Sequence, residues 1–143
     1  MATQIIIDTS VFISWLFSDE NSIYTKKVMD GFFGGNYNFI APALFADEIL
    51  NVLLKSFSSG RINRQEYQLH FDTIQKYYSL FGLINYQPTF SELEERGNLA
   101  LQYGLRSYDS QYLYLALKHQ SPLATTDKKL IQAARTEKVF LEI

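Results

Sequence analysis

Gln4-Ile5-Ile6-Ile7-Asp8-Thr9-Ser10 is the most informative stretch of the chain, because it joins a short apolar, β-branched run to an acid and two hydroxyl residues. A run of this kind predicts a buried strand, as found in parallel sheets that are covered on both faces. In such sheets, ligands bind outside the carboxyl ends of the strands. The stretch therefore predicts a first strand over residues 4–7 and places Asp8 where a binding site is expected.

The rest of the chain alternates short apolar runs with longer segments of helical pattern. Further strands are predicted over residues 38–41, 82–86, 123–125 and 139–141. Helices are predicted over residues 23–33, 43–57, 63–80, 89–103, 108–119 and 127–135. Residues 11–22 are assigned to no regular element. The alternation predicts a three-layer α/β/α fold with a mostly parallel central sheet, built as a single domain over residues 1–143.

Several helix starts carry specific signals. Residues 63–66 (Asn-Arg-Gln-Glu) and 89–92 (Thr-Phe-Ser-Glu) both have the spacing of a capping box. Pro42 suits the first turn of a helix, where its missing N–H costs nothing. Ser107 is a candidate cap for the helix that follows it. These signals predict where four of the helices begin.

The composition excludes several classes of protein. The chain is 47% hydrophobic and 15% aromatic, which is too apolar for a disordered chain. It has no cysteine, so disulfides, zinc–thiolate sites and thiol nucleophiles are excluded. No apolar stretch reaches the roughly 18 residues of a membrane helix, and the N-terminus lacks a basic signal region, so a cytoplasmic location is expected. The net charge of −2 offers no bulk attraction to nucleic acid, which leaves only a local basic track.

Asp8 and Asp127 each follow a predicted strand, where an α/β sheet binds its ligands. Each acid also precedes a segment that it could cap as a helix N-terminal residue. The residue pattern leaves both roles open for both acids.

Glu48 lies within a predicted helix whose apolar positions are so frequent that it is expected to be largely buried. Asn51 and Lys55 follow Glu48 at i+3 and i+7, on the same face. A carboxylate in such a helix needs a partner, because an unpaired buried charge is very costly. The adjacent Asp47 is rotated by about 100° and is expected to face solvent. Glu48 is therefore the acid that local structure explains least.

Asp109 is in the first turn of a predicted helix, where it either stabilises the helix dipole or points into a pocket above the sheet. If these acids cluster, they raise one another's pKa unless they bind cations. With oxygen ligands alone, the expected ion is Mg²⁺ or Mn²⁺. Such ions lower the pKa of an attacking water and stabilise charge on phosphate oxygens, so a cluster would suit phosphodiester hydrolysis.

Four segments, in this order, resemble the motifs of the PIN domain, and within it the VapC-type toxins of bacterial and archaeal toxin–antitoxin pairs. The segments are Ile5-Ile6-Ile7-Asp8-Thr9-Ser10-Val11, Ala41-Pro42-Ala43-Leu44 through Glu48 to Asn51-Val52-Leu53, Tyr108-Asp109-x-x-Tyr112-Leu113-x-Leu115-Ala116, and Leu123-Ala124-Thr125-Thr126-Asp127-Lys128-Lys129-Leu130. The third motif often has Ala after its Asp, where this chain has Ser110. The resemblance covers nearly the whole chain.

The resemblance implies a Mg²⁺-dependent (or Mn²⁺-dependent) endoribonuclease that forms a homodimer and is inhibited by a cognate antitoxin. It implies that the catalytic and metal-binding acids are Asp8, Glu48, Asp109 and Asp127. Around them, we expect Ser10, Asn51 and Thr125 to orient the ligands. Lys55 and Lys128 are candidate contacts to RNA phosphates.

Two alternative functions stay open. One is a PIN-like module that binds RNA or protein without cutting, and the other is a housekeeping RNA-processing nuclease. The aromatic segment from Tyr67 to Tyr86 is also ambiguous: Tyr77, Tyr78 and Phe81 either stack on bases or pack in the core or at a partner surface. The residue pattern favours packing.

Overall fold

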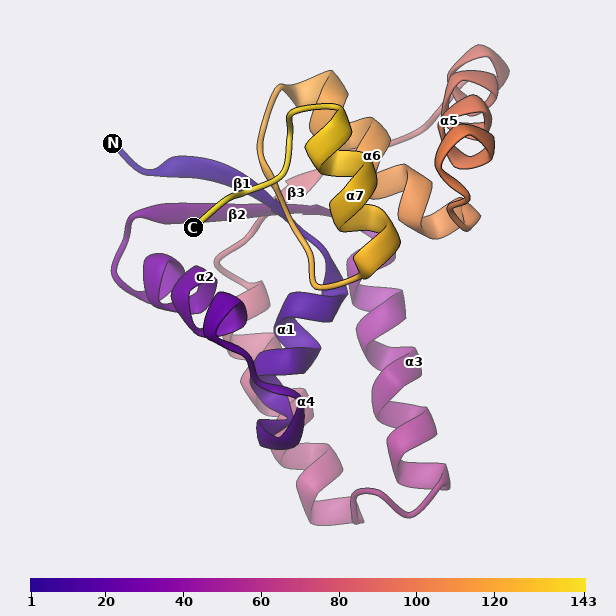
Figure 1. Ribbon diagram of the computed structural model, residues 1–143. Helices are drawn as coiled ribbons and strands as arrows, with labels where there is room; N and C mark the ends of the chain where they lie inside the picture. The colour runs from indigo at the N-terminus through magenta and orange to yellow at the C-terminus, as the bar shows by residue number, and fades with distance from the viewer.

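Four short parallel strands form the centre of the computed structural model, which describes residues 1–143 (Figure 1). Their bounds are Thr3–Ile7 (β1), Tyr37–Pro42 (β2), Gly82–Ile84 (β3) and Leu123–Ala124 (β4). The order across the sheet is β3-β2-β1-β4, and every neighbouring pair is parallel. All four carboxyl ends therefore lie at one edge of the sheet.

Helices cover both faces of this sheet, which confirms the predicted three-layer α/β/α fold. On one face lie Thr9–Leu16 (α1), Ile23–Phe33 (α2), Leu44–Ser58 (α3) and Arg64–Tyr78 (α4). On the other lie Phe90–Tyr103 (α5), Ser107–His119 (α6) and Lys128–Thr136 (α7). A short 3₁₀ turn, Ser18–Glu20 (η1), follows α1. None of the helices is both long enough and apolar enough to span a membrane.

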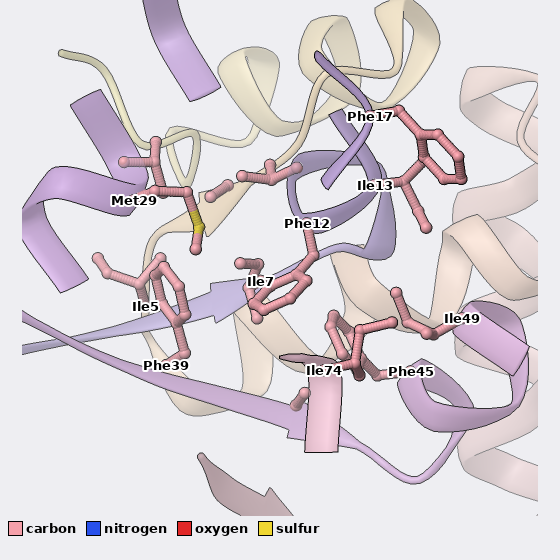
Figure 2. Packing of buried hydrophobic residues seen from close by; sticks show 14 of the residues in the cluster. Ile5, Ile7, Phe12, Ile13, Phe17, Met29, Phe39, Phe45, Ile49 and Ile74 are labelled. Atoms are coloured by element: carbon pink, nitrogen blue, oxygen red, sulfur yellow. The ribbon is translucent and has the colours of Figure 1, made fainter. Parts of the chain in front are cut away.

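The alternating side chains of β1 separate two hydrophobic cores. Ile5 and Ile7 pack among the side chains of α1 to α4, as Figure 2 shows around Phe12 and Phe39. Ile6 points to the opposite face and packs against α6 and α7. All three isoleucines are fully buried, and each burial stabilises the fold by about 1.5–3 kcal/mol. This double burial explains why the first strand is a continuous apolar run.

Aromatic rings fill the first core. Phe32 stacks on Phe39 with ring centres 4.4 Å apart, and Tyr78 stacks on Phe45 at 5.7 Å. Tyr77 and Phe81 are partly buried against the same cluster. The preference for core packing over base stacking in this segment is therefore confirmed.

Several predicted boundaries are confirmed and three are wrong. Both capping boxes are present, at Asn63–Glu66 and Thr89–Glu92. Pro42 is the last residue of β2, where it pairs with Ile84 of β3, and it therefore precedes α3 instead of lying in its first turn. Ser107 is the first residue of α6 and does not cap it. The predicted last strand is reduced to a single bridge between Leu123 and Phe140.

Two helices differ from expectation. Residues Thr9–Leu16 form α1, which was assigned to no element. Most of α1 is buried, so its sequence lacks the apolar and polar faces of a surface helix. Helix α3 was expected to be largely buried, but Leu50, Leu54 and Phe57 are exposed on it. These side chains face a groove between α3 and α4 or the solvent beside it.

Candidate active site

The strand register places the ends of β1 and β4 side by side at the carboxyl edge of the sheet. Ile7 pairs with Ala124, and the Asp8 N–H donates to the Ala124 carbonyl at 3.0 Å. Asp8 therefore lies beside Thr125, although the two residues are far apart in the sequence. Its side chain is buried and does not cap α1, which excludes the helix-cap role for this acid.

Two hydroxyl groups hold one oxygen of the Asp8 carboxylate. Ser10 Oγ donates to Asp8 Oδ2 at 2.8 Å, and Thr125 Oγ1 donates to the same atom at 2.7 Å. Each hydroxyl also accepts a backbone N–H from the loop after β4, at Thr126 and Asp127 respectively. These backbone donors fix the direction of both hydroxyls. The other oxygen, Oδ1, faces only the Thr9 hydroxyl, at 3.3 Å.

Glu48 reaches the same region from α3. Tyr112 in α6 is fully buried, and its phenol donates to Glu48 Oε1 at 2.6 Å. The Thr9 hydroxyl lies 3.5 Å from that oxygen, at the limit for a hydrogen bond, and so stands between Glu48 and Asp8. The partner that a carboxylate on this helix requires is therefore Tyr112.

Asp109 approaches from the first turn of α6. The Arg106 Nε donates to Asp109 Oδ2 at 3.3 Å, across one helical turn. The Arg106 side chain is 85% exposed, whereas that of Asp109 is 15% exposed. Ion pairs this open to solvent contribute at most about 1 kcal/mol, so the pair leaves Asp109 available to other partners.

Asp127 caps α7: its Oδ1 accepts the Leu130 N–H at 2.9 Å. The helix-cap role, which the sequence left open, is thus present at this acid and absent at Asp8. Its second oxygen accepts no hydrogen bond. A capping role uses one oxygen and does not prevent the other from binding a ligand.

All four predicted acids line one cleft of about 360 Å³ at the carboxyl edge of the sheet. Glu20, from η1, also lines it, and Arg106 is its only cationic residue. In this arrangement, no three acids converge closely enough to hold a metal ion between them. Glu48, Asp109 and Asp127 are instead engaged by Tyr112, Arg106 and the start of α7. The donors are nonetheless carboxylates and hydroxyls alone, which is the set that Mg²⁺ and Mn²⁺ prefer.

The electrostatics of the cleft favour neutralisation of its acids. Burial raises the pKa of Asp8, against the lowering effect of the Thr125 and Ser10 hydroxyls, and the charge of Asp109 raises it further. Burial also raises the pKa of Glu48, where the Tyr112 hydrogen bond opposes it and the charges of Asp8 and Asp109 add to it. The phenol pKa of Tyr112 is raised, mainly by burial and then by the nearby acids. A bound cation would act in the opposite direction and favour the charged form of these acids.

The other predicted residues differ in their surroundings. Lys128 is at the start of α7 and lines a groove next to the cleft. Asn51 lines a second neighbouring groove, and its side chain makes no hydrogen bond. Lys55 is exposed one turn beyond Asn51 and lines neither the cleft nor these grooves. No contact in the structure therefore supports a role for Lys55.

Sequence reasoning missed Arg106 and the pairing role of Tyr112. Arg106 lines the cleft and both neighbouring grooves. A basic residue three positions before Asp109 was a usable signal, since this spacing brings side chains together at a helix start. The contact between Tyr112 and Glu48 spans 64 positions, so no local pattern could have revealed it.

The PIN domain is the family whose sequence pattern matches residues 5–136. The crystal structure of PAE2754 from Pyrobaculum aerophilum is 22% identical, with a TM-score of 0.68 over 93% of this chain and 86% of that one. The crystal structure of FitAcB from Neisseria gonorrhoeae is 15% identical, with a TM-score of 0.64 over 92% of this chain and 93% of that one. Likeness at these identities shows the fold alone. Among curated proteins, none matches the sequence significantly.

Proposed function

The chain belongs to the PIN domain family, and on this premise we propose that it is a metal-dependent endoribonuclease that acts as the toxin of a toxin–antitoxin pair. PIN domains are generally nucleases. The observation that carries the proposal is that Asp8, Glu48, Asp109 and Asp127 come from four different segments and line one cleft. Four acids gathered in this way do not stabilise the fold, because their mutual repulsion costs free energy.

We assign the ligand role for Mg²⁺ or Mn²⁺ to these four carboxylates. When bound, the cation would lower the pKa of an attacking water and stabilise charge on the phosphate. Ser10 and Thr125 hold Asp8 Oδ2, which leaves Oδ1 directed away from them for ligation. Tyr112 fixes the carboxylate of Glu48, so that two of the acids are oriented before substrate arrives.

The partners follow from the same proposal. The groove between α3 and α4 is lined almost wholly by apolar residues, including Leu50 and Phe71, and we assign it to a segment of the antitoxin. We assign contact between two copies of the chain to the exposed apolar residues Phe90 and Leu101 on α5. Each assignment predicts that a charged substitution there abolishes the complex and leaves RNA cutting intact.

The central test is cleavage of RNA by the purified chain, with Mg²⁺ or Mn²⁺ and with a chelator. We expect cutting only with the divalent ion, and strongly reduced cutting by Asp8→Asn. Asp72→Asn is the matched control, because Asp72 is an exposed acid on α4 that binds only Gln68. Titration calorimetry with Mn²⁺ alone should show binding to the wild type and to Asp72→Asn, and much weaker binding to Asp8→Asn.

Cutting that persists with the chelator, or that is undiminished in Asp8→Asn, would contradict the metal-nuclease proposal. Absence of cutting together with tight RNA binding would favour the non-catalytic module instead. The toxin role has a separate test: expression of the wild type should arrest growth, whereas Asp8→Asn should not. Cutting without growth arrest would favour a housekeeping nuclease.

A further inference from the structure

Arg106 lines three neighbouring hollows on the surface. Besides the acid cleft, it lines a groove of about 480 Å³ together with Lys128 and Lys129, which we call the lysine groove. It also lines a groove of about 780 Å³ together with Asn51 and Tyr108, which we call the tyrosine groove. Arg106 is the one residue that lines all three. The cleft also shares Thr9, Glu48 and Val52 with the tyrosine groove, and Asp109, Thr126 and Asp127 with the lysine groove. A strand of nucleic acid that crosses the acids has a path on either side of Arg106.

The cations beside the cleft have donor atoms that are available to a ligand. Of the thirteen Lys and Arg residues, several are held by carboxylates, as Lys26, Arg61, Lys118 and Arg135 are. Lys128 and Lys129 form no ion pair or hydrogen bond, and both are exposed. Arg106 uses only its Nε, so its two terminal nitrogens have no partner. A guanidinium with free terminal nitrogens is suited to bidentate binding of a phosphate.

The two grooves differ in chemistry. The lysine groove has no apolar residue in its lining. Its three cations outnumber its two acids, Asp109 and Asp127, which it shares with the cleft, so it favours the phosphates of a backbone. The tyrosine groove contains Asp47 and Glu48, which repel phosphate, but also Leu44, Val52 and the ring of Tyr108. Tyr108 is 61% exposed, although an aromatic ring gains by being covered. This lining suits a nucleobase, stacked on the ring and reached by the free amide of Asn51.

We propose that the chain binds single-stranded RNA across the acid cleft, with backbone phosphates in the lysine groove and one unpaired base against Tyr108 in the tyrosine groove. Arg106 holds the phosphate between them, having released Asp109. The inference rests on the proposed nuclease function, which supplies the cut in the intervening cleft. It adds which side of the cleft holds backbone and which holds base. Double-stranded RNA does not fit, because its bases are already stacked.

The test is binding of a short, fluorescein-labelled single-stranded RNA, followed by anisotropy in the Asp8→Asn background, so that the RNA is not consumed. Salt is varied from about 50 to 200 mM. Each lost phosphate contact should reduce the slope of log affinity against log salt by about 0.7. We expect this reduction in Arg106→Ala, and about twice as much in the Lys128→Ala, Lys129→Ala double variant. Lys76→Ala is the control. This exposed lysine lies near the end of α4, which leads to the amino end of β3, at the edge of the sheet opposite the cleft.

Substitution of Tyr108 should change the affinity for RNA but not its salt dependence. Tyr108→Ala should weaken binding by about 5- to 150-fold, the cost of one stacked base, without a change in salt slope. Tyr108→Phe should restore the affinity, because it keeps the ring. The melting temperature of every variant should match that of the background, since these side chains are exposed.

The outcomes separate the inference from the function on which it rests. If the wild type cuts RNA but the Arg106 and lysine variants keep the slope of Lys76→Ala, the phosphate path is wrong. If Tyr108→Phe binds as weakly as Tyr108→Ala, the hydroxyl acts and the stacked base is wrong. A wild-type chain that neither binds nor cuts RNA would overturn the proposed function itself. Equal affinity for a hairpin stem and an unpaired strand would also contradict the inference.

Discussion

The two sides of the acid cleft are built differently. On the inner side, Asp8 is buried and accepts two hydrogen bonds from hydroxyls that backbone N–H groups hold in place. On the outer side, Asp109 meets only the exposed Arg106, and Asp127 is shared with the start of α7. The inner side is fixed by strand register, while the outer side depends on the starts of two helices. We infer that the inner side sets the reaction geometry and the outer side adapts to substrate.

Asp8→Asn should have the largest effect and show that the inner side is built for chemistry. We expect cleavage to fall by about 10²- to 10³-fold, as when a preorganised charge-stabilising group is removed. The free energy of unfolding should be unchanged or higher, because burial raises the pKa of Asp8 and the charged form is costly to fold. RNA cleavage and urea unfolding of the same preparation measure both. A loss of both stability and cleavage would make Asp8 a structural residue.

Thr125→Val should show how strongly the inner side depends on its hydroxyls. Valine fills the same buried volume but cannot donate to Asp8 or accept from the Asp127 N–H. Leaving such groups unpaired costs about 1–3 kcal/mol of stability. Loss of a partner that orients a metal ligand should weaken Mn²⁺ affinity by about 10- to 100-fold. Thr125→Ser is the matched control, and it should recover most of the Mn²⁺ affinity measured by calorimetry.

Local signals explain why the inner side could be predicted from the sequence. The run Ile5-Ile6-Ile7 ends at Asp8, and a parallel sheet brings the ends of its strands together, so Asp8 and Thr125 could be expected at one edge. The capping boxes were equally readable because each is closed within four residues. The α1 helix was missed because burial on most sides removes the periodicity by which a helix is recognised.

The outer side depends on long-range placement, which the sequence does not encode locally. That Arg106 faces three hollows follows from where α6 begins relative to α3 and α7. The exposed leucines of α3 were read as core because exposure depends on whether α4 covers them. The joining of four acids into one site was likewise an expectation from family resemblance rather than from spacing.

Asp127 allows the cap and the proposed ligand role on the outer side to be separated. Asp127→Ser keeps a side-chain oxygen for the Leu130 N–H, whereas Asp127→Ala removes it. We expect the alanine variant to lose about 0.5–2 kcal/mol of stability and the serine variant to lose little. Cleavage should fall in both variants if the carboxylate binds the metal. Wild-type cleavage in Asp127→Ser would reduce this acid to a helix cap.

Substitution of Glu92 should produce the smallest effect, and this effect should be limited to the stability of the helices that support the outer side. It joins α5 to α6, accepting from Lys118 at 2.8 Å and from Tyr114 at 3.0 Å. The hydrogen bond from Lys118 first, then those from the Thr89 backbone and Tyr114, lower the pKa of Glu92 to about 2. Because its pKa is lower in the folded chain than its ordinary value of 4.5, its contribution to stability is complete above about pH 5 and disappears as the pH falls toward 2.

The comparison of wild type with Glu92→Gln at several pH values isolates this group, because all other acids titrate in both proteins. The wild type should be the more stable at pH 7, by a margin that shrinks steadily between pH 5 and pH 3 in urea unfolding. Mn²⁺ affinity at pH 7 should not differ between the two, since Glu92 does not line the acid cleft. A margin that stays constant with pH would mean that Glu92 supports α6 by packing rather than by charge. A change in Mn²⁺ affinity would mean that the α5–α6 junction also positions Asp109, and that the outer side is as rigidly built as the inner one.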